Sequence, residues 1–189
     1  MKAIVDYFSA MLPYALASLP FSIILRIILG KRLQTKGLKA EKEHDIVWVL
    51  FVMFMVALVS QTILPDFSEI SLESIKLGLE RVNLIPFKEI RIAFSLKGSF
   101  FFVNFIGNIV MFLPIAFFVG LLYNKPSFLK CVLITTGFSV LVELCQLPQD
   151  RGTDIDDVIL NTLGGIVGYL LYLLVDRIFP KFSKKCKVN

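Results

Sequence analysis

The sequence has few of the residues that most often bind metals, form disulfides or act as catalytic bases. Its one histidine, His44, lies in a polar stretch and is expected to be a solvated loop residue, so a histidine-based catalytic or metal site elsewhere in the chain is excluded. The three cysteines are an odd number. Cys131 and Cys145 would lie about 21 Å apart on one helix, which is too far for a disulfide. All three cysteines are therefore expected to be free thiols.

The sequence also has no internal repeat and no low-complexity segment. Many secondary transporters are built from internal repeats, so this absence argues against a small transporter. The apolar segments also lack a row of polar residues that would continue through the whole membrane, and this absence too argues against a transporter.

Apolar residues, by contrast, are abundant. They make up 56% of the 189 residues, including 18 phenylalanines, and the mean hydropathy is +0.76. A soluble domain of this length would have too little polar surface to cover so much apolar side chain. Several apolar runs approach the roughly 20 residues that a helix needs to cross a bilayer. The chain is therefore expected to form a single membrane domain over residues 1–189.

The positive charge is concentrated beside the apolar runs. The net charge of +5 comes mainly from the segments 31–42 and 177–187, which favours a topology signal over a nucleic-acid partner. Because basic loops stay in the cytoplasm, the protein is expected to cross the cell membrane several times, with its N-terminus outside and its C-terminus cytoplasmic. The five expected spans are residues 7–29, 46–64, 99–123, 128–147 and 158–179.

The longest loop, residues 65–98, is expected outside the cell. Leu72, Ile75, Leu79 and Val82 recur in it at steps of three and four residues, with charged residues between them. This spacing predicts an amphipathic helix over residues 71–82 that lies on the membrane surface. The predicted fold is an all-α integral membrane protein with about five transmembrane helices and a short external amphipathic segment.

Polar residues gather where spans three, four and five reach the outer surface. The segment 151–157 holds four charged residues, and the asparagines, glutamate and glutamine of the three spans fall at a similar depth. Polar groups in a membrane helix are costly unless they face one another or a ligand, so we expect them to form one pocket. The candidate ligand-binding residues are Asn104, Asn108, Glu143, Gln146, Arg151, Asp154, Asp156, Asp157 and Asn161.

Each of these residues also has a purely structural interpretation. Membrane asparagines often hydrogen-bond a neighbouring helix, and Asp154 would be a normal N-cap. Glu143 is ionisable within a span, so its charge is expected to be used, as a general acid or base if the protein is an enzyme. A divalent cation, if one binds, would be held by Asp154, Asp156 and Asp157, and no other cofactor is expected.

Four segments stand out by their order and spacing: 83–87 (NLIPF), 108–114 (NIVMFLP), 143–146 (ELCQ), and 151–157 (RGTDIDD) running on to Asn161, Gly164, Gly165 and Gly168. Together they resemble the VanZ-like membrane protein family, of the teicoplanin-resistance protein type, with a core over about residues 46–179. The chain has Ala116 and Asp150 where the family pattern often has glycine. The resemblance implies a Gram-positive-type membrane protein associated with resistance to teicoplanin-like glycopeptides.

The sequence leaves three functions open, in this order. The first is a non-enzymatic envelope protein whose outer pocket binds a membrane lipid or cell-wall precursor. The second is a membrane enzyme acting on a lipid-linked envelope substrate, against which no nucleophile–base pair can be recognised. The third is a small transporter. The sequence carries no signal for the oligomeric state or for the identity of the ligand.

Overall fold

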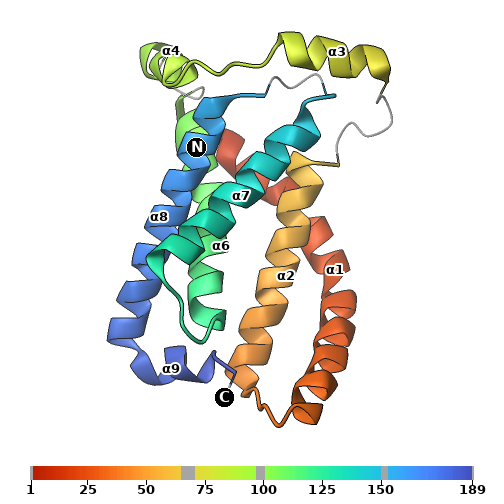
Figure 1. Ribbon diagram of the computed structural model, residues 1–189, viewed down its shortest axis with the longest axis vertical. Helices are drawn as coiled ribbons and strands as arrows, with labels where there is room; N and C mark the ends of the chain where they lie inside the picture. Colours follow the sequence, from red (N-terminus) through yellow and green to blue (C-terminus); the bar gives the residue numbers. More distant parts are fainter. Residues whose placement is uncertain (1, 65–70, 97–100, 150–152, 189) are drawn as a thin grey trace.

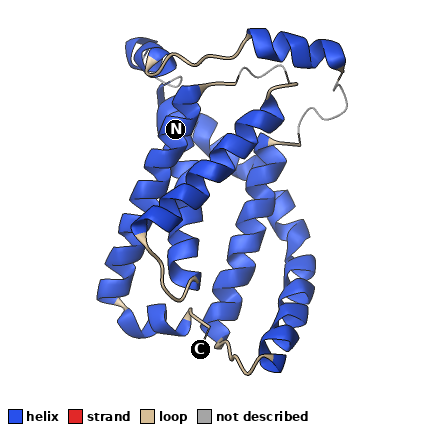
Figure 2. Cartoon of the chain, viewed as in Figure 1, coloured by secondary structure: helices blue, strands red, loops and turns tan. Residues whose placement is uncertain are grey.

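The computed structural model describes residues 2–64, 71–96, 101–149 and 153–188. The described residues are almost entirely helical and contain no strand (Figure 2). The one extended pairing among them is an isolated parallel bridge between Asn83 and Asp154. The predicted all-α class is therefore confirmed.

Five helices are long and apolar enough to cross a membrane, which confirms the predicted number of spans. The third is preceded by a π-helical turn, η2, which widens the helix just before Asn108. The helices are α1 (Lys2–Thr35), α2 (Lys42–Thr62), α6 (Asn108–Leu122) after η2 (Phe102–Gly107), α7 (Phe128–Gln146) and α8 (Ile155–Ile178).

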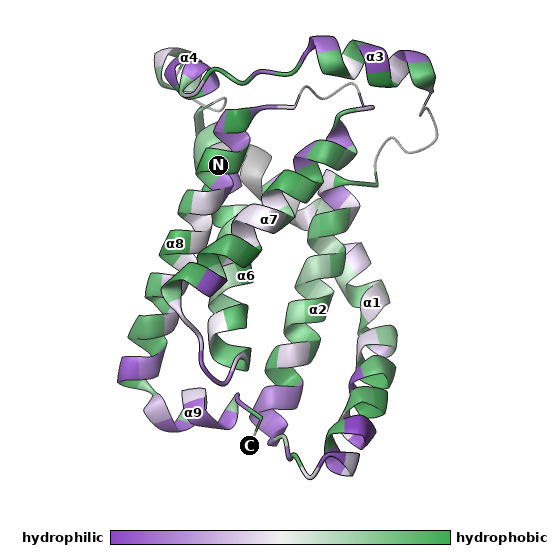
Figure 3. Ribbon diagram, viewed as in Figure 1, coloured by the Kyte–Doolittle hydropathy of each residue, from purple (hydrophilic) through white to green (hydrophobic). Residues whose placement is uncertain are grey.

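Short helices lie across the two ends of this bundle (Figure 1). Helices α3 (Leu72–Glu80) and α4 (Lys88–Leu96) lie at the end where α1, η2 and α8 begin, here called the α3–α4 end. Helix α9 (Pro180–Lys185) lies at the opposite end, here called the α9 end. Polar residues concentrate at both ends, while the helices between them are largely apolar (Figure 3).

Helix α3 confirms the expected amphipathic segment. It begins with a capping box, in which the Ser74 N–H donates to Ser71 Oγ at 3.0 Å and the Ser71 N–H donates to Ser74 Oγ at 2.9 Å. On its apolar face Leu72 is 81% exposed and Leu79 is 58% exposed within the protein. That these side chains face lipid stays a prediction.

Glycines let α8 approach its neighbours closely. A Cβ on Gly164 would lie 2.4 Å from the Ile109 carbonyl oxygen, and one on Gly168 would lie 2.0 Å from the Leu113 carbonyl oxygen. These distances are too short for any side chain, so backbone packs on backbone between α6 and α8.

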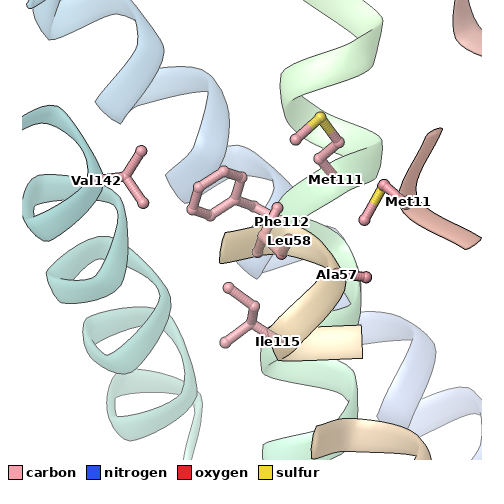
Figure 4. Close-up of a cluster of buried hydrophobic side chains, with 7 residues drawn as sticks. All are labelled: Met11, Ala57, Leu58, Met111, Phe112, Ile115 and Val142. Atoms are coloured by element: carbon pink, nitrogen blue, oxygen red, sulfur yellow. The ribbon is translucent and has the colours of Figure 1, made fainter. Parts of the chain in front are cut away.

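A core of apolar side chains joins α1, α2, α6 and α7 (Figure 4). Dispersion contacts in such a core stabilise helix association in a membrane, where lipid removes the usual hydrophobic driving force. The buried members are Met11, Ala57, Leu58, Met111, Phe112, Ile115 and Val142.

Two polar side chains at the α9 end, His44 and Arg26, are buried. His44 was expected in a solvated loop, but it is 5% exposed and its Nδ1 lies 2.6 Å from the Cys186 carbonyl oxygen. The prediction was wrong because α2 begins earlier, at Lys42, and the end of α9 packs against its first turn. Arg26 of α1 is 6% exposed, and its Nη2 lies 2.5 Å from Asp45 Oδ1 of α2.

Candidate functional site

The loop after α3 is joined to the start of α8 by backbone hydrogen bonds. The Asn83 N–H donates to the Thr153 carbonyl at 2.9 Å, and the Ile155 N–H donates to the Asn83 carbonyl at 3.0 Å. The Asn83 side chain adds to this join, since its Nδ2 lies 3.1 Å from both carboxylate oxygens of Asp154. Two of the segments that carry the family resemblance therefore meet directly.

Asp156 holds the start of α4 from the first turn of α8. The residue is 1% exposed, and its carboxylate accepts from the Phe87 N–H at 2.5 Å and from the Ile90 N–H at 3.1 Å. Phe87 has a φ of 65°, a left-handed conformation that costs a bulky residue on the order of 1 kcal/mol or more. Asp156 thus caps α4, because the carboxylate neutralises N–H groups that the helix itself leaves unpaired.

Glu143 supports the same junction from α7. It is 4% exposed, and its Oε2 accepts from the Asp154 N–H at 3.0 Å, while its backbone carbonyl accepts from Thr153 Oγ1 at 3.2 Å. Asp154 in turn caps α8, with Oδ1 accepting from the Asp156 N–H at 2.8 Å. The Glu143 carboxylate therefore holds the turn that leads into α8.

Asn108 links α6 to the start of α8. Its Nδ2 donates to Asp157 Oδ1 at 2.6 Å. Asn104 lies one turn earlier within η2, where it is exposed. The π-helical turn rotates Asn104 relative to Asn108 by comparison with a regular α-helix, and π-turns are frequent at functional sites.

A cavity of about 320 Å³ opens between α4, η2 and the start of α8. Its walls carry both signs of charge, with Arg81 and Lys88 from the α3–α4 segment and Glu89 and Asp157 among the acids. Such a mixture suits a ligand that offers anionic groups together with hydroxyls or amines. The lining residues are Arg81, Asn83, Lys88, Glu89, Ile90, Ala93, Asn104, Phe105, Thr153, Asp154, Asp156, Asp157 and Leu160.

Two further candidate residues, Gln146 and Asn161, are not among the residues that line this cavity. Gln146 donates from Nε2 to the Thr62 carbonyl at 2.9 Å and so ties α7 to the end of α2. Asn161 donates from Nδ2 to Ser139 Oγ at 2.8 Å, between α8 and α7, and its buried Oδ1 has no hydrogen-bond partner among the described residues. Arg151 lies outside the described residues.

The structure adds residues that the sequence did not single out. Arg81, Lys88 and Glu89 line the cavity, and Asn83 joins its two walls. The segment 83–87 was noted for its resemblance, which was the available signal for Asn83. No local pattern identified the three charged residues, because exposed lysines, arginines and glutamates are common on amphipathic helices.

The aspartates are engaged with protein donors. Asp154 and Asp156 each accept at least two hydrogen bonds, and Asp157 accepts one from Asn108. Within the described ranges, no group of three or more His, Cys, Asp or Glu side chains is arranged to hold a metal ion. Binding of a divalent cation by these three residues stays a prediction.

The residues that line the cavity lie within the part of the chain that matches a known protein family. The family model described as VanZ/LLP1 matches residues 46–176, which include every lining residue of the cavity. Protein VanZ of Enterococcus faecium is 32% identical over 97 residues, which cover 51% of this chain and 55% of that relative. The chain thus matches about half the length of this curated relative. No solved structure matches the chain.

Proposed function

Because the chain belongs to the VanZ/LLP1 family, we propose that it binds a cell-envelope ligand in the cavity at the α3–α4 end and thereby supports resistance to teicoplanin-like glycopeptides. The protein is a multi-pass membrane protein. The observation that carries the proposal is the cavity itself, which is lined by residues of α4, of η2 and of the start of the membrane-span helix α8.

The chemistry of the cavity favours a lipid-linked precursor or a lipid head group. Lys88 and Arg81 suit phosphate or carboxylate oxygens, while Asn104 and Asp157 suit hydroxyls and amines. The apolar walls supplied by Ile90 and Phe105 suit the first carbons of a lipid. A volume of about 320 Å³ is at the lower end of small-molecule sites and fits a head group better than a whole glycopeptide.

The proposal is tested by charge reversal on the cavity wall. Cells that express equal amounts of parent, Lys88→Glu or Lys76→Glu are compared for teicoplanin susceptibility, with membrane abundance measured in parallel. Lys88 lines the cavity, whereas Lys76 is an exposed residue of α3 that does not. We expect Lys88→Glu alone to lose resistance. Full resistance in the Lys88→Glu cells would overturn the proposal.

The proposed function needs the α3–α4 end to face outward. Support comes from the basic residues at the α9 end. Lys31 and Arg32 lie in the last turns of α1, Lys36 follows this helix, and the tail after α8 is basic. A reporter active only in the cytoplasm, fused to either terminus, should work at the C-terminus and stay silent at the N-terminus. The reverse pattern would place the cavity inside and contradict an envelope ligand.

A membrane enzyme with Glu143 as general acid or base ranks second. Glu143 is buried, its Oε2 is engaged with the Asp154 N–H, and it is not among the residues that line the cavity. A general acid or base must come within hydrogen-bond reach of the substrate. The position of Glu143 therefore favours a role in holding Thr153 and Asp154, which lead into α8.

A further inference from the structure

A second cavity lies at the α9 end, between the last turns of α1 and the first turn of α2. Its volume is about 290 Å³, and its lining includes Arg26, Gln34, Lys39 and Asp45. These residues precede the segment that the family model matches, which begins at residue 46. Neither the family model nor the proposed function at the opposite end assigns a role to this cavity.

Arg26 is the unusual group on its wall. The residue is only 6% exposed, and its Nη2 lies 2.5 Å from Asp45 Oδ1. Its Nε is buried and has no hydrogen-bond partner among the described residues. A buried donor without a partner is costly, so a ligand oxygen at this position would stabilise the site. Gly30 keeps the space beside the guanidinium open, since a Cβ there would lie 3.3 Å from Arg26 Nη1.

The rest of the lining suits a phosphate at a membrane surface. Lys39 supplies a second cation and Gln34 supplies an amide donor, while Asp45 offsets one positive charge. Leu33 and Leu38 supply apolar walls beside these polar groups. Arginine and lysine together recognise phosphate oxygens well, arginine through paired N–H groups and lysine as a point charge.

The outer surface of α1 offers a path for acyl chains from this cavity. Ile23, Ile24, Ile27 and Ile28 are all at least 43% exposed within the protein, around the position of Arg26 in the sequence. A lipid whose phosphate lies in the cavity could extend its chains along such an apolar surface. A soluble phosphate would gain nothing from it.

We infer that this cavity binds the phosphate of an anionic phospholipid in the leaflet at the α9 end. The guanidinium of Arg26 and the ammonium of Lys39 contact the phosphate, and the lipid packs between α1 and α2. Bound lipid then stabilises the α1–α2 pair, whose contact at this level depends on the Arg26–Asp45 ion pair.

The test measures thermal stability of the purified protein in detergent, by loss of the monodisperse peak after heating. Added dioleoylphosphatidylglycerol should raise the midpoint of the parent, and dioleoylphosphatidylcholine should not. Lys39→Gln should raise the lipid concentration needed for half the effect about threefold, as expected for a partly exposed charge. Lys36 is an exposed residue of the same segment that does not line the cavity, so Lys36→Gln should leave this lipid concentration unchanged.

A double variant tests Arg26 without leaving the Asp45 charge unpaired, which could by itself cause misfolding. Arg26→Gln with Asp45→Asn removes both charges of the pair together and should weaken the lipid effect tenfold or more, about the value of a charged hydrogen bond. The inference would be overturned if the two lipids shifted the midpoint equally. It would also be overturned if Lys36→Gln and Lys39→Gln raised the lipid concentration for half the effect by the same factor. A midpoint shift with inorganic phosphate as large as that with phosphatidylglycerol would identify a soluble anion and also overturn it.

Discussion

The contacts that hold the helices together at the α3–α4 end differ in kind from those at the α9 end. At the α3–α4 end, the buried carboxylates of Glu143 and Asp156 accept backbone N–H groups from distant parts of the chain. At the α9 end, α9 is tied to α2 through the exposed pair of Lys185 and Glu43, 2.8 Å apart, and through His44. Water and salt screen exposed ion pairs, whereas buried charged hydrogen bonds keep most of their strength.

This difference teaches where the fold is most sensitive to sequence. The α3–α4 end needs particular carboxylates at particular positions, because each one satisfies N–H groups that would otherwise be buried without partners. At the α9 end, we expect exchange of the exposed charges of Lys185, Glu41 and Glu43 to be tolerated. Asn83, Asn108 and Glu143, which belong to three of the segments that resemble the family, each contact the start of α8 at the first end.

The largest effect is expected where α8 meets α6 just below the α3–α4 end. Gly164→Val would drive its side chain into the Ile109 carbonyl, and overpacking against backbone costs about 3 kcal/mol. The control is Gly137→Val, since a Cβ on Gly137 meets nothing within 4 Å. Heating in detergent followed by size-exclusion chromatography should show early loss of Gly164→Val alone. Equal stability of the two variants would contradict the close packing.

The next effect concerns the carboxylate that caps α4. Asp156→Ala leaves the N–H groups of Phe87 and Ile90 without their acceptor, at a cost of about 2 kcal/mol. Amide hydrogen exchange should become faster at Ile90, while Asp6→Ala, a change at an exposed residue of α1, should leave it unchanged. Unchanged exchange at Ile90 in Asp156→Ala would mean that α4 is held by other contacts.

Glu143 separates a supporting role from a catalytic one. Glu143→Gln keeps an oxygen that can accept the Asp154 N–H, so stability and resistance should both be retained, contrary to the use of its charge expected from the sequence. Glu143→Leu removes the acceptor and should cost about 2 kcal/mol and lower the abundance. Loss of resistance in Glu143→Gln at normal abundance would restore the enzyme hypothesis.

The smallest effect is expected at the α9 end. Lys185→Gln removes the exposed ion pairs to Glu43 and Glu41, and its melting midpoint should match that of Lys181→Gln within error in physiological salt. The hydrogen bond to Glu43 raises the pKa of Lys185, so the pair stays charged through neutral pH and its contribution is lost only in strongly alkaline solution. If Lys185→Gln lowered the melting midpoint at neutral pH as much as Asp156→Ala does, the proposed contrast between the two ends would be wrong.

The helices could be predicted from the sequence because their signals are local. Apolar runs of sufficient length gave the five spans, and the spacing of Leu72, Ile75, Leu79 and Val82 predicted α3. Helix ends were less accurate. Helix α8 begins at Ile155 rather than 158 because Asp154 caps it, and no sequence signal indicated the π-helical turn η2 before Asn108.

The sequence by itself determined the class of the protein, the number of its membrane helices and the presence of polar residues near one end. Only the tertiary structure decided which polar residues meet. Asn83 joins Asp154 across 71 residues, and Gln146 turns to the end of α2 instead of to the cavity. The physical reason is that hydrophobic periodicity is set within one helix, whereas the pairing of side chains depends on how neighbouring helices are rotated and how the loops between them are tied.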